Sequence, residues 1–153
     1  MKSFRRHVAA DQGSALVELA VALPVLVLLL LGAADFARVF STSIALTDAA
    51  RAGAQYGAYS LARSTDTGGM QSTAQAAVNV SGVAASASRS CYCAPDNGSA
   101  FTAAACSATC TSSQHLLVTV SVTASKTFTT SSQLPGIPSS IALSRTATMR
   151  VAN

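Results

Sequence analysis

Charged and aromatic residues are scarce in this chain of 153 residues, and tryptophan is absent. Charged residues make up 10% of the sequence and aromatic residues 5%. The net charge of +4 includes three basic residues near the N-terminus, and the other basic residues are scattered without a cluster. Because a nucleic-acid surface needs a basic stripe or aromatic side chains that stack on bases, the sequence argues against a nucleic-acid partner.

Residues for a catalytic or metal site are also few. The histidines are His7 and His115, and no second histidine in the body of the chain completes a general-base or metal pair. Asp48, Asp66 and Asp96 fall in separate segments, and the sequence contains neither a Gly-rich phosphate loop nor a Ser-centred nucleophile elbow. We therefore expect no enzyme activity, no metal and no cofactor.

A long apolar run occurs once in the sequence, over residues 19–34, which hold neither a charge nor a hydroxyl group. As a helix, residues 14–34 span about 30 Å at ~1.5 Å per residue, enough to cross the hydrocarbon core of a membrane. Pro24 inside the run removes a helical hydrogen bond and is expected to bend or loosen the helix locally. The sequence thus predicts a transmembrane helix over residues 14–34.

Basic residues ahead of this helix set its orientation. Lys2, Arg5 and Arg6 precede the apolar run, and no comparable cluster follows it closely. Under the positive-inside rule the N-terminus stays in the cytoplasm, and residues 35–153 face the oxidising side of the membrane.

A secretory signal peptide cleaved near residues 32–34 has the same basic and apolar parts and is the alternative. Glu18, at the start of the apolar run, argues against it. A carboxylate costs about 2.5–3.5 kcal/mol at a helix centre and less near the interface, and a plain export signal has no use for it. On this alternative the chain is a membrane-anchored or secreted envelope protein that binds a ligand or surface through a disulfide-stapled domain.

The residues around Glu18 follow a recognisable pattern: Gly13, four small or apolar residues and then the glutamate, with a basic leader before and an apolar helix after. This pattern resembles the class III signal of type IV prepilins and pseudopilins. The sequence also resembles the TadE-like pseudopilins of the tight-adherence (Tad/Flp) pilus system, closely over residues 13–58. The resemblance is carried by residues 13–20, Leu23-Pro24, Leu31-Gly32, Asp35-Phe36, Arg38 and residues 49–54.

This resemblance implies how the chain is processed and used. A prepilin peptidase would cut after Gly13, which removes residues 1–13 as a basic leader and makes Ser14 the first residue of the mature chain. The protein would sit in the bacterial inner membrane, with residues 35–153 as a periplasmic pilin-like domain. It would then be assembled as a minor or initiating subunit of a tight-adherence pilus. Its partners would be the peptidase, other pilins and pseudopilins, the pilus machinery and membrane lipid.

Elementary electrostatics gives Glu18 a role in such a chain. Cleavage after Gly13 creates an ammonium group on Ser14, about one helical turn before the carboxylate. Glu18 can pair with that ammonium in the same chain or in a neighbouring subunit. A pair between subunits sets the axial register of their helices, because an unpaired charge is costly in an apolar bundle. The simpler interpretation is that the helix dipole favours Glu18 in the first turn of a helix.

Beyond the membrane the helical pattern continues to about residue 63. One face carries bulky and then small residues at three- and four-residue spacing: Phe36, Phe40, Ile44, Thr47, Ala50, Ala54 and Gly57. Residues 67–69 predict a break, and residues 70–83 predict a second, Ala-rich helix. Residues 84–113 are small, polar and Cys-containing, which indicates a loop.

Three segments near the C-terminus predict strands. Residues 116–123 alternate with period two and are rich in β-branched side chains, as in a half-buried strand. Residues 126–130 and 141–151 supply two more, with a turn over residues 134–138 between them. The expected fold class is therefore α+β, with an antiparallel sheet of about three strands packed against the long helix.

Four cysteines fall in the predicted loop: Cys91, Cys93, Cys106 and Cys110. In an oxidising compartment they most simply form two disulfides with three possible connectivities, and pairing across the loop is favoured over a bond between Cys91 and Cys93. Such bonds stabilise a protein by roughly 2–4 kcal/mol each. A four-thiolate zinc site is the alternative, but the spacing lacks the usual paired two-residue knuckles.

Overall fold

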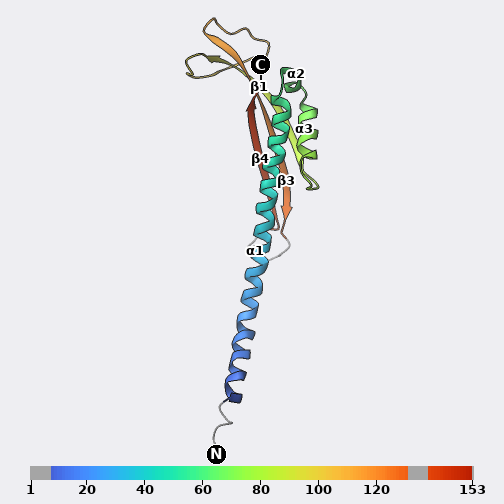
Figure 1. The fold of residues 1–153 in the computed structure, drawn as a ribbon, viewed down its shortest axis with the longest axis vertical. Coiled ribbons are helices and arrows are strands. Elements are labelled where there is room, and N and C mark those ends of the chain that lie inside the picture. The colour runs from blue at the N-terminus through green and yellow to red at the C-terminus, as the bar shows by residue number, and fades with distance from the viewer. Residues whose placement is uncertain (1–7, 131–137, 153) are drawn as a thin grey trace, which may run out of the picture. The chain divides into compact units, whose positions relative to one another are not determined.

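A computed structural model describes residues 8–130 and 138–152 (Figure 1). Its contacts divide the chain into two units, which we call the N-terminal unit (Met1–Arg38 and Thr130–Ser139) and the sheet unit (Val39–Thr129 and Ser140–Asn153). The elements in chain order are α1 (Val8–Ala58), α2 (Leu61–Ser64), α3 (Thr67–Ala76), β1 (Ala84–Pro95), β2 (Thr102–Ala104), β3 (Gln114–Thr129) and β4 (Ser140–Arg150). The predicted α+β class and the long N-terminal helix are confirmed.

Helix α1 ends at Ala58, so the prediction that it continues to about residue 63 was too long. The residue that stops it is Ser60, whose backbone is extended, with φ −159° and ψ 159°. The Ser60 side chain accepts a hydrogen bond from the backbone N–H of Arg63 and thereby caps the short helix α2. Serine favours this capping position because its hydroxyl satisfies an N–H group that has no partner inside the helix.

Helix α3 begins at Thr67, whereas a break over residues 67–69 and a helix over residues 70–83 were predicted. That prediction was wrong because the side chain of Asp66 caps the helix. The Asp66 carboxylate accepts a hydrogen bond of 2.8 Å from the backbone N–H of Gly69. This cap offsets the low helix propensity of two glycines in the first turn. The helix ends at Ala76, and the chain then turns at Gly82, whose φ of +76° favours glycine.

The strands form one antiparallel sheet in the order β2-β1-β3-β4. It has four strands where about three were predicted. Strand β4 agrees with the strand predicted over residues 141–151, but β3 is continuous where two strands, 116–123 and 126–130, were predicted. Most of the turn predicted over residues 134–138 lies outside the described residues.

Strand β1 lies within the segment that was predicted to be a loop, residues 84–113. From Ala85 onward its first half alternates alanine with serine, and Ala85 and Ala87 are half-buried while Ser86 and Ser88 are exposed. Because alanine and serine have low strand propensity, the local sequence gives little indication that this segment forms a strand. Pairing with β3 along the whole strand, from Ala84↔Ser125 to Pro95↔Gln114, supplies the stabilisation that the local sequence lacks.

The core of the sheet unit is built from Leu46 and small residues on α1 and from larger residues on β3 and α3. Within the sheet unit, the C-terminal part of α1 and helix α3 lie side by side on one face of the sheet (Figure 1). Two clusters of buried residues join them: Ala54, Met70, Ala74, Cys91, Val118, Val120, Val122 and Val151 form the first, and Leu46, Ala49, Ala50 and Ala124 form the second. Small side chains let the helix approach the strands closely.

The predicted stripe on α1 is buried at its small end and exposed at its bulky end. Ala50 and Ala54 are at most 1% exposed. Phe36, Phe40 and Ile44 are 72%, 60% and 49% exposed. The bulky residues therefore do not build the core of this chain.

Hydroxyl side chains cover the other face of the sheet. Cross-strand hydrogen bonds of 2.7 Å join Ser121 to Thr148 and Thr123 to Thr146. Threonine and serine pairs of this kind stabilise a sheet while they keep its solvent face polar.

A polar cluster ties the end of α1 to the start of α3. The Tyr56 hydroxyl donates a 2.8 Å hydrogen bond to Asp66, and the Arg63 guanidinium lies 4.9 Å and 4.7 Å from the ring centroids of Tyr56 and Tyr59. Hydrogen bonds from the Gly69 backbone and then from Tyr56 hold the pKa of the Asp66 carboxyl below its ordinary value. The same Tyr56–Asp66 bond raises the pKa of Tyr56. The cluster is thus most stable with Asp66 ionised and Tyr56 neutral.

Replacing Gly53 by alanine is expected to destabilise the sheet unit. A Cβ atom there would lie 2.7 Å from the carbonyl oxygen of Met70 and 3.0 Å from both Ala74 and Val122. Because a backbone atom is the nearest neighbour, the helices must separate, and we expect a loss of about 1–3 kcal/mol. Guanidinium unfolding of the full chain in detergent micelles, followed by tyrosine near-UV circular dichroism, measures the loss.

The matched control is Gly68→Ala, in the exposed first turn of α3. A Cβ atom there meets the Asp66 carboxylate at an ordinary 3.7 Å. The free energy of unfolding should stay the same or rise by up to ~1 kcal/mol. Equal effects of the two substitutions would contradict close packing at Gly53.

Asp66→Asn is expected to flatten the dependence of stability on pH at the acid end. The folded pKa of Asp66 is below its ordinary 3.8. Its contribution is therefore complete above pH 3.8 and lost as the pH falls through the folded pKa. Asparagine keeps a capping oxygen but does not titrate. As the pH is lowered through the acid range, the urea midpoint of unfolding should fall more steeply for the natural chain than for the variant. If the midpoints of the two chains fall in parallel, Asp66 does not have this role.

Candidate processing and assembly segment

Gly13 and Ser14 lie inside α1, because the helix begins at Val8 and not at residue 14. Both residues are exposed. A Cβ atom built on Gly13 would meet no atom within 4 Å, so packing within this chain does not require a glycine there. Glycine weakens a helix by about 1 kcal/mol relative to alanine, which makes Gly13 a point where the helix unwinds easily.

Glu18 lies one helical turn after Ser14. The Ser14 hydroxyl donates a 3.4 Å hydrogen bond to Glu18 Oε1. The helix thus places the backbone of residue 14 and the carboxylate of residue 18 on neighbouring turns of the same face. Glu18 is exposed and has no cationic side chain bonded to it among the contacts of the described residues.

A shallow depression on α1 includes Glu18. Its lining is apolar apart from that carboxylate and consists of Val17, Glu18, Val21, Ala22, Val25 and Leu26. Ala22, one turn after Glu18, was not among the residues singled out from the sequence. The signal that identifies it is a small residue four positions after the carboxylate, among larger Val and Leu side chains.

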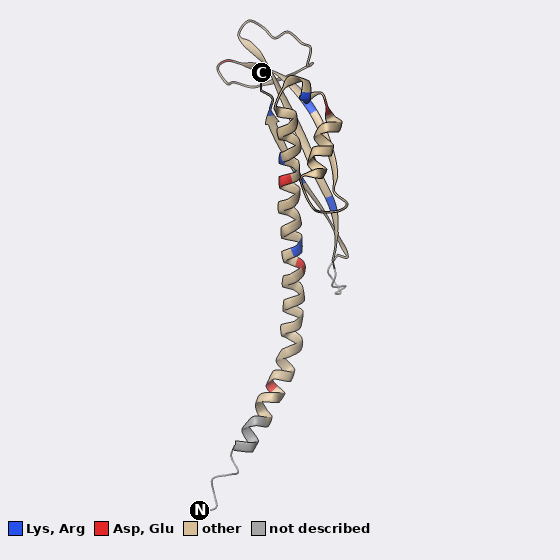
Figure 2. Cartoon of the chain, turned by 45° about the vertical axis from the view of Figure 1, so that its right-hand side comes forward, with Lys and Arg blue, Asp and Glu red and all other residues tan. Residues whose placement is uncertain are grey.

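The apolar surface around this depression is uncovered. In the N-terminal unit, Leu16, Val21 and Leu30 are 69%, 71% and 69% exposed. An 18-residue window of α1 reaches a mean hydropathy of 2.6 with no residue buried, so by length and composition the helix is able to cross a membrane. Figure 2 shows that charged residues are few along α1. An apolar surface of this size needs lipid or other helices around it.

Two features inside and after the apolar run concern the helix itself. The chain stays helical through Pro24, and the bend expected there remains a prediction. Asp35 and Arg38 form an ion pair of 4.0 Å one turn apart, just beyond residue 34. Charged groups therefore return to the helix where the predicted span ends.

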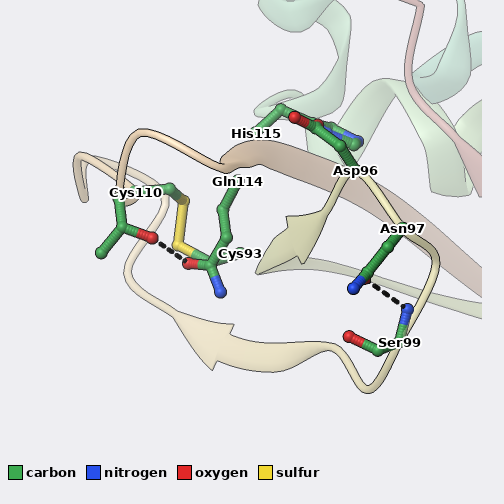
Figure 3. Close-up of polar contacts among 8 residues, drawn as sticks. Cys93, Asp96, Asn97, Ser99, Cys110, Gln114 and His115 are labelled. Atoms are coloured by element: carbon green, nitrogen blue, oxygen red, sulfur yellow. Dashed lines mark hydrogen bonds and ion pairs between the residues drawn. A yellow bond between two sulfur atoms is a disulfide. The ribbon is translucent and has the colours of Figure 1, made fainter.

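The four cysteines form two disulfides, Cys91–Cys106 and Cys93–Cys110. The Cα atoms are 5.1 Å and 5.6 Å apart, and both bonds connect β1 to the segment after it. Figure 3 shows the second bond beside the start of β3. Since all four sulfur atoms are in disulfides, the structure leaves no thiolate for the zinc alternative.

The other titratable residues remain apart. His115 pairs with Asp96 at 3.1 Å, and both side chains are exposed (Figure 3). Within residues 8–130 and 138–152, no group of three or more His, Cys, Asp or Glu residues lies close enough to hold a metal ion. The basic leader, residues 1–7, lies outside the described part of the chain.

These features define an α+β protein in which, among the described residues, one N-terminal apolar helix fits a single-pass membrane anchor. A family model described as TadE-like protein matches residues 13–55. The resemblance predicted from the sequence is confirmed over that segment, and it links the chain to pilin-like proteins of the Tad pilus. Searches of the curated proteins and of the solved structures found no match.

The state of the cysteines tests the predicted orientation. If residues 35–153 face the oxidising side, both disulfides form in cells, because cytoplasmic reductants do not reach them. Alkylation with a maleimide in freshly lysed, acid-quenched cells should add no label, and alkylation after reduction should label all four cysteines. Four labels without reduction would place the domain in the cytoplasm.

Proposed function

We propose that this chain is a minor, pseudopilin-like subunit of a tight-adherence pilus, processed by a prepilin peptidase after Gly13. Before processing it is anchored in the bacterial inner membrane with its N-terminus in the cytoplasm and the sheet unit in the periplasm. One observation carries the proposal. A glycine and a glutamate five residues apart stand at the mouth of an uncovered apolar helix, within the segment that matches the TadE-like family.

Support for processing comes from Gly13 itself. The residue is exposed, and nothing in the chain occupies the space that a side chain would fill. A glycine at this position, before the glutamate, suits recognition, because a peptidase needs a locally unwound chain and a small residue at the cut. Glycine provides both.

Support for assembly comes from the charge and the shape of α1. Cleavage leaves an ammonium group on Ser14, and the nearest carboxylate along the helix is Glu18, whose side chain Ser14 already contacts at 3.4 Å. When such helices are packed together, the carboxylate of one subunit can pair with the ammonium of the next. The apolar depression at Ala22 can receive an apolar side chain from the same neighbour.

The pair would fix how far one helix is shifted along the other. In the correct register both charges are neutralised, whereas a shifted register leaves a carboxylate and an ammonium unpaired among Leu and Val side chains. An uncompensated buried charge costs about 3–5 kcal/mol. This cost is larger than the differences in apolar contact between neighbouring registers, since most side chains along the helix are alike.

The sheet unit acts in this proposal as a structural domain. Its disulfides and its close helix packing hold the fold outside the membrane, and its partners are other pilins, pseudopilins and the pilus machinery. We assign it no catalytic role.

The mature protein is expected to begin at Ser14. In cells that contain the prepilin peptidase, N-terminal sequencing of the membrane-extracted chain should start at SALVE.

Gly13→Val should block this cut, because a branched side chain stiffens the helix and enlarges the residue at the cut. Gly32→Ala, at a second glycine with open space around it, is the matched control and should be processed normally. A start at Met1 refutes the proposal, and a start near Asp35 supports the secreted alternative.

Glu18→Leu is expected to permit membrane insertion and to reduce incorporation into filaments. Without the carboxylate the Ser14 ammonium of a neighbour stays unpaired, and a cost of several kcal/mol lowers incorporation by roughly tenfold or more. Quantitative immunoblotting of sheared pili measures this. Asp48→Asn, which removes an exposed carboxylate on the same helix, should have no effect. Normal incorporation of Glu18→Leu would refute the role of Glu18 in register.

A further inference from the structure

The two disulfides of the sheet unit have different surroundings. Cys91 is 4% exposed and belongs to the same core cluster as Val118 and Met70, and Cys106 packs against that cluster. Cys93 and Cys110 are both partly exposed, and neither is a member of a core cluster of the described residues. Cys106 is itself partly exposed, so the core shields the Cys91–Cys106 bond at its Cys91 end, whereas the Cys93–Cys110 bond is partly exposed at both ends.

The two bonds also hold different parts of the segment after β1. Cys106 follows β2 closely, and β2 pairs with β1 through Cys91↔Ala104 and its neighbours. Cys110 lies in residues 107–113, which make turn bonds such as Ala108 N–H to the Ala105 carbonyl and one bond from Asp96 N–H to the Ser113 carbonyl. The first bond reinforces a strand ladder, whereas the second holds a segment built from turns (Figure 3).

We infer that these disulfides form a graded redox device, in which a dithiol reductant opens Cys93–Cys110 while Cys91–Cys106 stays closed. Exchange requires that a thiolate reach a disulfide sulfur, so its rate depends on access. Opening the exposed bond releases residues 107–113. The sheet and β2 stay in place, because the β1–β3 ladder and the Cys91–Cys106 bond do not depend on that segment.

The chemistry is a two-electron exchange. A thiolate of the dithiol attacks one sulfur of Cys93–Cys110, a mixed disulfide forms, and the other cysteine leaves as a thiolate and takes up a proton. The second thiol of the reductant, as its thiolate, then attacks the mixed disulfide and releases the remaining cysteine. The dithiol ends as a disulfide, and Cys93 and Cys110 end as thiols.

The experiment is a time course of dithiothreitol reduction on the oxidised full chain in detergent micelles, quenched by acid and alkylated, with the labelled cysteines identified by peptide mass spectrometry. Label should appear on Cys93 and Cys110 roughly tenfold faster, or more, than on Cys91 and Cys106, because the core shields Cys91 and restricts attack on that bond. Equal rates, or earlier label on Cys91 and Cys106, would overturn the inference.

Hydrogen exchange on the partly reduced chain supplies a second readout. Amides of residues 107–113 should exchange faster than in the oxidised chain, and amides of β2 should be unchanged. If exchange becomes equally faster in residues 107–113 and in β2, opening Cys93–Cys110 disturbs both segments, and the inference is wrong.

Matched double variants separate the two bonds. Replacing Cys93 and Cys110 by serine should lower the unfolding midpoint of the sheet unit less than replacing Cys91 and Cys106, because neither Cys93 nor Cys110 packs in the core clusters. Replacing Cys91 and Cys106 by serine should lower it markedly or prevent folding. The reverse order of effects would overturn the inference.

Discussion

A carboxylate in the first turns of an apolar helix is tolerated where another group offsets its charge, and Glu18 stands in that situation. Around it lie Val and Leu side chains that no part of the described chain covers. The nearest polar contact is the Ser14 hydroxyl, one turn earlier. A hydroxyl only weakly offsets a full negative charge in lipid, whereas an ammonium created at the same residue neutralises it. On the proposed function, the leader, the glycine and the glutamate have one common explanation, in which cleavage supplies the counter-charge.

Helix α1 meets two different surroundings along one continuous sequence, and its side chains change accordingly. Residues 14–34 are mostly Leu, Val and Ala and are exposed, as lipid or neighbouring helices require. Toward the C-terminus the contacting residues become Ala49, Ala50, Gly53 and Ala54, which allow strands and α3 to approach the helix closely. The exposed face of the sheet is hydroxyl-rich and polar, so it presents no large apolar surface of its own.

The sequence predicted most of what rests on strong local signals. The apolar run, the glycine-to-glutamate spacing and the alternation of β3 and β4 are such signals. It did not reveal β1, because Ala-Ser alternation favours neither strand nor helix, and the strand forms through pairing with β3. The start of α3 was missed because the cap is a side-chain contact of Asp66 that outweighs two glycines. At the candidate site the charged residue was identified but Ala22 was not, since a depression depends on the sizes of neighbouring side chains.

The central claim is that the Glu18 carboxylate pairs with a new N-terminal ammonium of a neighbouring subunit. Zero-length carbodiimide cross-linking of intact pili, followed by peptide mass spectrometry, tests it directly, because this reagent joins a carboxylate and an amine only where they touch. The account predicts an amide bond between Glu18 and the N-terminal amine of an adjacent subunit. A Glu18 that stays unlinked in assembled pili, while other carboxylate–amine contacts in the same sample are joined, would contradict it.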